Sequence, residues 1–411
     1  MSKKTPVLVI SQLFYPELIS TGQSMTELCE SLIKKDLDIN VICAPPTVSD
    51  TKTVVPKIMN YQGITIRRVW TTRFPKLSFI GKVINQLTFF ISIFFVLLKT
   101  NKNVPVLVFT NPPFIACLCA IFRLFGGAPF IYTIYDVYPE TAIQLGVLSA
   151  KNPISMIWRW LNTVVYSQAE TIMVIGRCME TVIKQQLTDK QQPKLKRIHV
   201  YNDEVRLMKS INAENPFISR WNLLGKFVVS YAGNMGRFHD METIIKAAYT
   251  LQDYDDIVFL FIGDGYKKKT MMAYVKQHSI ANCQFYDYVE RDELGLCLSS
   301  ADIGLVSLLE NQVGLSVPSK TMGLMAAGIP IIGILPSESE IALIIKEEAC
   351  GYISPTGNSD ALVKCIVDAY NNPKKRLKMG NQARKAVQSK YSLECAANIY
   401  YDMIKSLSEE I

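Results

Sequence analysis

Histidine is scarce in this sequence, and cysteine occurs without pairing. The three histidines, His199, His239 and His278, are far apart and lack the spacing of metal ligands, so each is expected at the surface or in a polar part of the core. The ten cysteines stand singly except for Cys117 and Cys119, without the pair of pairs that holds a structural zinc ion. We therefore expect reduced core thiols. No signal peptide is expected before the first apolar strand, and both features indicate a cytoplasmic protein.

The sequence also lacks low-complexity segments, short repeats and the glycine fingerprint of nicotinamide cofactors. No G-x-G-x-x-G follows the apolar run PVLVIS at 6–11, which argues against a dehydrogenase of that type. With 411 residues, 49% of them hydrophobic, the chain can bury a large core. These features predict a folded protein of two domains.

Basic residues outnumber acidic residues only in the first half of the chain. Residues 1–206 hold 23 basic and 13 acidic side chains, whereas residues 207–411 hold 21 and 23, so the net charge of +8 arises in the first half. A basic face attracts the phosphates of anionic lipid, of nucleic acid or of a pyrophosphate-linked substrate. A solvated surface without a partner is the alternative.

The apolar run VINQLTFFISIFFVLL at 83–98 is short for a membrane span. Its sixteen uncharged residues would form a helix about 24 Å long, whereas the hydrocarbon core is about 30 Å thick. Two interpretations remain. The run is a core helix of an α/β domain, or it lies in the membrane interface, where Lys82 and the basic and aromatic residues of RRVWTTRFPK (67–76) would meet headgroups.

Short apolar runs alternate with segments of helical spacing along the whole chain. This pattern predicts an α/β protein with two doubly wound parallel sheets, one in a domain at 1–206 and one in a domain at 207–392, with the polar segment 203–224 at the boundary. Ligands of such sheets bind beyond the carboxyl ends of the strands, so two facing domains place the site in the cleft between them. The expected strands are 6–11, 38–44, 64–70, 104–110, 129–135, 171–175, 226–233, 257–265, 283–289, 301–308 and 329–334.

A glycine-rich turn follows the first strand of the second half. In YAGNMGRFHDMETIIKAA (231–248) the chain turns through Gly233, Asn234 and Gly236, places Arg237 at the bend and continues as an amphipathic helix. Backbone N–H groups and a helix dipole at such a turn suit a phosphate, and the arginine adds bidentate donors. An ordinary strand-to-helix connection with a solvated arginine has the same pattern.

A second cation lies at the start of another predicted helix. In VPSKTMGLMAAGIPII (317–332), Lys320 precedes the small residues Gly323, Ala326 and Ala327, which permit close approach of a ligand. Lys320 and the arginine of the glycine turn would hold a diphosphate from two sides, because two like charges need an anion between them.

Four motifs of the second half occur in one order: GNMGRFHDMETIIKAA, FIGDG (261–265), VPSKTMGLMAAGIPII and CGYISPTGNSDAL (350–362). Together they resemble the donor half of glycosyltransferase family 4, the retaining sugar-nucleotide enzymes with the GT-B fold. FYPELISTGQSMTELCESL (14–32) is similar to the glycine loop and first helix of that family. FTNPPFIACLCA (109–120) and IYDVYPETAIQLG (134–146) resemble the branch that includes fucosamine transferases of surface-polysaccharide assembly. The resemblance covers nearly the whole chain.

The resemblance implies roles for individual residues. Arg237 and Lys320 match the pair that neutralises the diphosphate leaving group, and a metal ion or other cofactor is not implied. Asp136 falls beside the reacting sugar, with Glu140 one helical turn further if that loop is helical. Gly22 matches the loop that approaches the phosphates and the sugar. The expected catalytic residues are Asp136, Arg237 and Lys320, and the expected sugar-nucleotide contacts are Gly22, Gly233, Asn234, Gly263, Asp264, Gly265, Tyr288, Val289, Ser319 and Glu340.

The sequence departs from the family at two positions. Leu315 and Gly323 stand where the family commonly has glutamates that contact the sugar hydroxyls and the ribose, and neither side chain can accept a hydrogen bond. Glu310 and Glu340 are candidates to replace them, and an exposed helix carboxylate is the alternative for each.

The activity implied is transfer of a hexosyl or N-acetylhexosaminyl group from a nucleoside diphosphate sugar with retention. The acceptor would be a glycan or a polyprenyl-pyrophosphate-linked sugar in bacterial O-antigen, capsule or exopolysaccharide synthesis. The enzyme would act in the cytoplasm against the anionic inner face of the plasma membrane, without nucleic acid, and its C-terminal helix (393–411) would pack back on the first domain. A non-catalytic GT-B subunit, suggested by the missing glutamates, and a sugar-nucleotide epimerase on the same fold are the alternatives.

Overall fold

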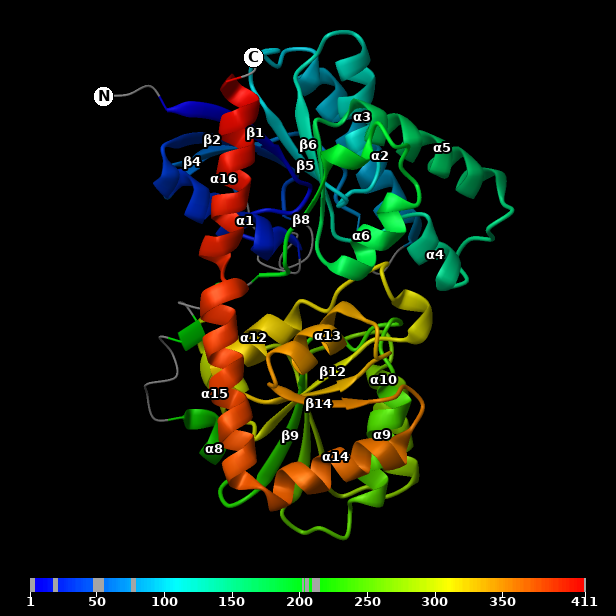
Figure 1. Cartoon of the computed structure of the whole chain (residues 1–411), viewed down its shortest axis with the longest axis vertical. Helices are drawn as coiled ribbons and strands as arrows, with labels where there is room; N and C mark the ends of the chain where they lie inside the picture. Colours follow the sequence, from blue (N-terminus) through cyan, green and yellow to red (C-terminus); the bar gives the residue numbers. More distant parts are fainter. Residues whose placement is uncertain are drawn as a thin grey trace. The chain divides into compact units, whose positions relative to one another are not determined.

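The computed structural model describes residues 4–17, 21–46, 55–74, 79–201, 203, 207–208 and 215–409. The chain divides into two compact units: Met1–Ile198 with Leu393–Ile411 form unit 1, and His199–Ser392 form unit 2. Each unit contains one sheet flanked by helices (Figure 1). The predicted division after residue 206 falls at Arg206, which lies outside the described residues.

Unit 1 contains an eight-stranded sheet in the order β3-β4-β2-β1-β5-β6-β7-β8. Neighbouring strands are parallel except β3 and β4. The strands are β1 (Thr5–Ile10), β2 (Leu37–Cys43), β3 (Ile58–Tyr61), β4 (Ile64–Arg68), β5 (Val106–Phe109), β6 (Phe130–Ile134), β7 (Thr171–Val174) and β8 (Leu195–Arg197). β5 and β6 are buried at every position, as expected of parallel strands covered on both faces. The six predicted strands are confirmed, whereas the edge strands β3 and β8 lack a buried apolar run and were not predicted.

The helices of unit 1 lie on both faces of its sheet. They are α1 (Thr21–Leu32), α2 (Phe79–Leu97), α3 (Ile115–Leu124), α4 (Glu140–Gln144), α5 (Pro153–Gln168), α6 (Arg177–Lys184) and α16 (Leu393–Glu409), with 3-10 turns at Ile33–Lys35 and Gln192–Lys194. The connections through α2, α3 and α5 step across the sheet in one direction, so right-handed crossovers place these helices on one face and α1 on the other. Contacts of α3 with both α2 and α5, and of α16 with α1 and β1, agree with this arrangement.

The C-terminal helix α16 belongs to unit 1. Its Tyr400 is fully buried, and the phenol oxygen lies 3.0 Å from Thr133 Oγ1 in β6. Near its start, Glu394 accepts an ion-paired hydrogen bond of 2.5 Å from Lys35 Nζ and a second bond from Ser31 Oγ. The last helix thereby packs against a sheet whose strands all lie at residues 5–197.

Helix α2 has two different apolar faces. Gly81, Asn85, Phe89, Ile93 and Leu97 recur every four residues and are buried against unit 1, as predicted for a core helix. The opposite side is largely exposed, and only 28% of the window Ile80–Leu97 is buried. The helix is longer than the sequence analysis predicted, and by length and composition it would suffice to cross a membrane. The core interpretation therefore accounts for one stripe of α2 and leaves its outer face unexplained.

Unit 2 contains a six-stranded, fully parallel sheet in the order β11-β10-β9-β12-β13-β14. Counted from the first strand of the unit, this is the order 3-2-1-4-5-6 of a Rossmann sheet. The strands are β9 (Phe227–Ala232), β10 (Ile257–Ile262), β11 (Cys283–Tyr286), β12 (Ile303–Ser307), β13 (Ile331–Ile334) and β14 (Gly351–Ser354). The prediction of a second parallel sheet is confirmed. The half-buried edge strand β14 was not among the predicted strands.

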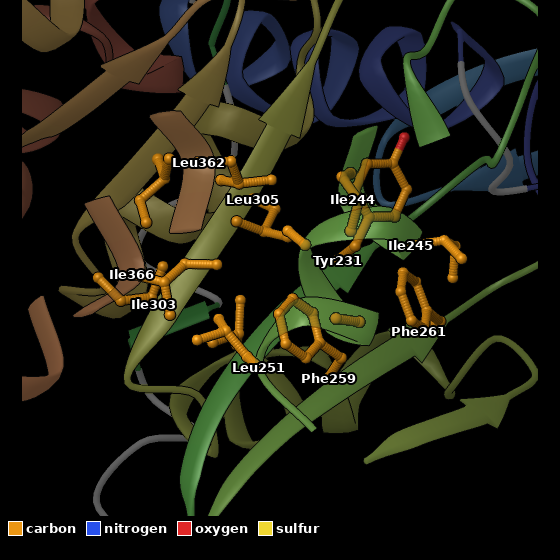
Figure 2. Close-up of a cluster of buried hydrophobic side chains, with 14 of the residues drawn as sticks. Tyr231, Ile244, Ile245, Leu251, Phe259, Phe261, Ile303, Leu305, Leu362 and Ile366 are labelled. Atoms are coloured by element: carbon orange, nitrogen blue, oxygen red, sulfur yellow. The ribbon is translucent and has the colours of Figure 1, made fainter. Parts of the chain in front are cut away.

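Helices pack on both faces of this second sheet. They are α8 (Pro216–Arg220), α9 (Met241–Thr250), α10 (Lys268–Gln277), α11 (Leu294–Ser299), α12 (Lys320–Ala327), α13 (Glu340–Glu347), α14 (Ser359–Asn371) and α15 (Pro373–Lys390), with 3-10 turns at Arg291–Glu293 and Glu310–Gln312. Figure 2 shows the core between the sheet and helices α9 and α14, where Tyr231, Phe259 and Phe261 gather with Ile244 and Leu362. These side chains bury β9 and β10 in the core of the unit, and the candidate site is built at the ends of those strands.

Candidate active site

The topology of unit 2 locates the candidate site at the carboxyl ends of its strands. From β9 the chain proceeds toward β10 on one side and returns to β12 on the other, so the strand order reverses between the neighbours β9 and β12. Crevices of open α/β sheets form at such a reversal. Most of the nucleotide contacts predicted from the sequence belong to loops that start at this edge.

Two hydrogen bonds join the glycine turns after β9 and β10 at this edge. Gly233 N–H donates to Ile262 O (2.8 Å), and Met235 N–H donates to Asp264 O (2.8 Å). Gly263 has φ +123°, and a Cβ on it would lie 2.4 Å from Gly233 O; a Cβ on Gly265 would lie 2.6 Å from the Met235 backbone. The turns after β9 and β10 therefore approach more closely than any side chain permits. The structure thus brings together the predicted residues Gly233, Gly263, Asp264 and Gly265.

Lys320 reaches the same turn from the first residue of α12, where the sequence predicted a helix start. Its Nζ donates to the Tyr231 hydroxyl, lies 3.5 Å from Asn234 O and sits 3.8 Å from the centre of the Tyr231 ring. Both Cε and Nζ would be 3.4 Å from a Cβ at Gly233. Burial lowers the pKa of Lys320 from 10.5 to about 7. Among the described residues no carboxylate forms an ion pair with this ammonium group, so its charge lacks an anionic counterpart.

Arg237 follows the same turn but points elsewhere. Its side chain is exposed, and its guanidinium stacks over the Tyr266 ring at 4.0 Å from the centroid. Within the part of the chain that the structure describes, no bond connects Arg237 with Lys320 or a carboxylate. The two-sided clamp therefore stays a prediction, in which Arg237 would have to turn from Tyr266 toward the ligand.

The residues predicted to contact the nucleotide base, and those beside the start of α12, lie at the outer border of this edge of the sheet. Tyr288 and Val289 follow β11; the tyrosine is 60% exposed, and its ring carbon would be 3.1 Å from a Cβ at Gly263. Ser319 is the residue before α12, and both its side chain and that of Asn234 are exposed. These residues are accessible to a ligand at the edge of the sheet.

His239, which follows the glycine turn, is buried. This agrees with the second of the two placements expected for each histidine, the surface or a polar part of the core. Its Nδ1 lies 2.6 Å from Ser307 O at the end of β12, so Nδ1 carries the proton and donates. Burial, and then the charge of Lys320, lower its pKa to about 3. The imidazole is neutral at physiological pH and adds no positive charge to the site.

Asp240, which was not predicted as a site residue, connects the start of α9 with the end of β12 and the loop after β14 through hydrogen bonds. It caps α9 by accepting from Thr243 N–H (3.2 Å), and its Oδ2 accepts from Gly357 N–H (2.7 Å) in the loop after β14. Its own N–H donates to Ser307 Oγ (2.7 Å) at the end of β12. An aspartate just before a helix predicts a cap, but the contacts with distant loops depend on the tertiary fold.

The two candidate replacements for the family glutamates differ in environment. Glu310 is exposed, and its Oε1 accepts from Thr356 Oγ1 (3.0 Å). Glu340, the first residue of α13, is buried, with Oε1 3.9 Å from His199 Nδ1. The alternative of an exposed carboxylate is therefore wrong for Glu340. Leu315 and Gly323 are both buried, as their apolar character suggests.

Unit 1 places its predicted residues at the corresponding edge of its own sheet. Gly22 lies in the first turn of α1, where a Cβ would be 2.6 Å from Glu17 O. Asp136 lies just beyond β6, and burial raises the pKa of its carboxyl group from 3.8 to about 6. Residues 135–139 are not helical, so the condition for placing Glu140 one helical turn from Asp136 is not met; Glu140 instead forms an ion pair with Arg159 (2.9 Å).

A metal-binding cluster is not found in the parts of the chain that the structure describes. Within residues 4–409, apart from the gaps given above, no group of three or more His, Cys, Asp or Glu side chains is arranged to hold a metal ion.

Comparison with known proteins places this edge within a matched domain. Residues 215–386, which include both glycine turns and Lys320, match the family described as Glycosyl transferases group 1. A Pseudomonas aeruginosa protein named as a probable glycosyltransferase, WbjE, is 29% identical over 294 residues, covering 72% of each chain. An Escherichia coli K12 protein named as a colanic acid biosynthesis glycosyl transferase, WcaI, is 21% identical over 356 residues, covering 78% of this chain and 81% of that one.

Solved structures match the fold over almost the whole chain. A sucrose-phosphate synthase from Thermosynechococcus elongatus superposes with a TM-score of 0.79 at 14% identity, covering 99% of this chain and 100% of that one. Anabaena HepE in complex with UDP-glucose superposes with a TM-score of 0.70 at 12% identity, covering 99% and 100%. The fold is GT-B, and together with the sequence relatives it supports the class of GT-B glycosyltransferases.

Proposed function

We propose that this protein is a retaining glycosyltransferase that takes a sugar from a nucleoside diphosphate sugar. The observation that carries the proposal is Lys320, a partly buried ammonium at a helix N-terminus, bonded only to neutral groups among the described residues. Burial without a counter-charge disfavours the protonated form, and a bound diphosphate would supply that charge. The complex of HepE with UDP-glucose, on the same fold, supports a sugar nucleotide as the ligand.

The leaving diphosphate accounts for the chemistry of this edge. As the bond between sugar and phosphate breaks, negative charge grows on the diphosphate, and Lys320 with the N-terminus of α12 would stabilise it. Arg237 would contribute a second set of donors after leaving Tyr266. The rigid turns at Gly233 and Gly263 allow the phosphates to approach the backbone closely.

Asp136 is proposed to act beside the reacting sugar, although it belongs to unit 1. Partial burial raises the pKa of its carboxyl group to about 6, so the group is largely ionised at physiological pH and can stabilise positive charge that develops on the sugar. Glu310 and Glu340 are proposed to contact sugar or ribose hydroxyls in place of the residues absent at Leu315 and Gly323.

The acceptor is proposed to be a glycan or polyprenyl-pyrophosphate-linked sugar in bacterial surface-polysaccharide synthesis. The name of WcaI, which refers to colanic acid biosynthesis, supports this setting. A hexosyl or N-acetylhexosaminyl donor, a fucosamine-type branch of family 4 and a cytoplasmic location at the inner membrane face are part of the same proposal.

The test is incubation of purified protein with a panel of sugar nucleotides and a bacterial lipid extract. We expect release of a nucleoside diphosphate together with a labelled lipid-linked product, whose new linkage keeps the anomeric configuration of the donor by NMR. Product formed from a donor without any acceptor would instead indicate an epimerase. Activity only after addition of a second polypeptide would indicate a non-catalytic subunit.

A further inference from the structure

Exposed large apolar side chains concentrate on one face of unit 1. We name it the α2–α3–α5 face, after the three helices that carry it. Monomeric soluble proteins seldom expose apolar patches of this extent without a binding partner. Its members, each at least 39% exposed, are Ile80, Val83, Leu87, Ile91, Phe94, Phe95, Leu98, Ile121, Leu124, Phe125, Ile154, Met156, Ile157 and Trp160.

The three helices are neighbours on the same side of the sheet. α3 contacts both α2 and α5, and the direction of their crossovers places all three on one face. On α5, Ile154, Ile157 and Trp160 recur every three residues on the outer side, whereas Trp158 is buried and stacks on Tyr138 at 5.4 Å. The exposed residues therefore form the outer surface of helices whose inner sides are buried in unit 1.

Charge indicates what covers this face. Residues 51–135, which contain α2 and α3, hold ten basic residues and no acidic residue. Lys82 lies in the first turn of α2, Lys99 and Lys102 follow this helix, and Lys151 precedes α5; all four are exposed. A wide apolar surface bordered by cations matches a bilayer whose headgroups are anionic, because lysine stems can extend to the phosphates while apolar side chains enter the acyl region.

Helix α2 would lie along the bilayer surface and not across it. Its inner side is fastened to residues 70–74: Asn85 Oδ1 accepts from Phe74 N–H (3.0 Å) and from Thr72 Oγ1 (2.8 Å), and Ser92 Oγ donates to Trp70 O (2.6 Å). A span would have to break these bonds and expose Asn85 to lipid. Only the outer side of α2 is available for insertion.

We propose that the α2–α3–α5 face docks unit 1 onto an anionic phospholipid bilayer. The proposal rests on the proposed function for its setting, a transferase working on lipid-linked acceptors. It assigns membrane contact to three helices together and thus differs from an interfacial helix acting alone.

Flotation of the purified full chain with vesicles tests the docking without any substrate. The vesicles are phosphatidylcholine with or without phosphatidylglycerol, and the variants are Leu87→Glu on α2, Trp160→Glu on α5 and the control Leu377→Glu, whose leucine is 68% exposed on α15 of unit 2. We expect binding that requires phosphatidylglycerol, a loss of at least about tenfold in partitioning for Leu87→Glu and for Trp160→Glu, and none for Leu377→Glu.

Other results would overturn the proposal. Absence of vesicle binding, or equal losses of binding in all three variants, would show that the α2–α3–α5 face is not a membrane-docking surface. Normal binding of Trp160→Glu beside lost binding of Leu87→Glu would restrict the contact to α2. A dimer that Leu87→Glu dissociates, without vesicle binding, would mean that a second copy covers the face. Transfer to a detergent-solubilised acceptor, measured separately, shows whether the proposed function survives any of these results.

Discussion

Binding of a sugar nucleotide should draw a proton from solution onto Lys320. In the free protein, burial holds the pKa of this lysine at about 7, so at pH 8 about 0.9 of the molecules carry a neutral amine at this position. A diphosphate beside Nζ favours the charged form and should return the pKa to its usual range. Lys320 then takes up about 0.9 proton near pH 8 and about 0.1 near pH 6.

Isothermal titration calorimetry in buffers of different ionisation enthalpy measures this number directly. A nucleoside diphosphate sugar is the suitable probe, because its two phosphates do not titrate in this range. His239, with a pKa of about 3, should remain neutral throughout. Lys320→Arg keeps a permanent charge and should bind without proton uptake, whereas Lys246→Met, at an exposed position of α9, should behave like the unmodified protein. Binding without proton uptake in the unmodified protein, or equal uptake in Lys320→Arg, would refute the reasoning.

Three further predictions concern residues that support the site. Asp136→Asn should raise the free energy of unfolding by up to about 3 kcal/mol near pH 8 but not near pH 3. The reason is that the unmodified protein loses the stability contributed by protonated Asp136 as the pH rises from the usual pKa of 3.8 through the folded pKa of about 6. Urea unfolding at both pH values checks this, and equal changes at the two pH values would contradict it. Gly263→Ala should lower the free energy of unfolding by more than about 3 kcal/mol, because its Cβ would lie 2.4 Å from a carbonyl oxygen. Gly225→Ala, at φ +74° with open space around it, should lower it by only about 1 kcal/mol. Similar losses in urea unfolding would show that the backbone angle φ alone determines the cost. Tyr400→Phe should lower stability by about 1 kcal/mol through loss of its bond with Thr133, and an unchanged urea midpoint would mean that this bond contributes nothing.

The sequence predicted the sheets well because their strands are buried on both faces. Runs such as IVFLFI in β10 have no other stable placement, and every residue of that strand is buried. The edge strands β3, β8 and β14 were not predicted, since their residues are half-exposed and owe their conformation to pairing with a neighbour.

The candidate site could be predicted only in part. The glycine turns and the helix start at Lys320 are local features that residue type determines. The partnership of Lys320 with Tyr231 and the contact of Arg237 with Tyr266 join residues brought together by the fold, which sequence spacing does not encode. The burial of Glu340 near His199 also depends on tertiary packing, and it made the expectation of an exposed carboxylate wrong.

The most direct test of the central claim is the rate of sugar transfer by Lys320→Met, with Lys246→Met as the matched control. Using the donor and lipid extract that serve the unmodified protein, we predict that Lys320→Met lowers kcat by about a hundredfold or more, because it removes the charge that stabilises the leaving diphosphate, while Lys246→Met leaves kcat unchanged. A Lys320→Met protein that transfers sugar at the unmodified rate would contradict the account.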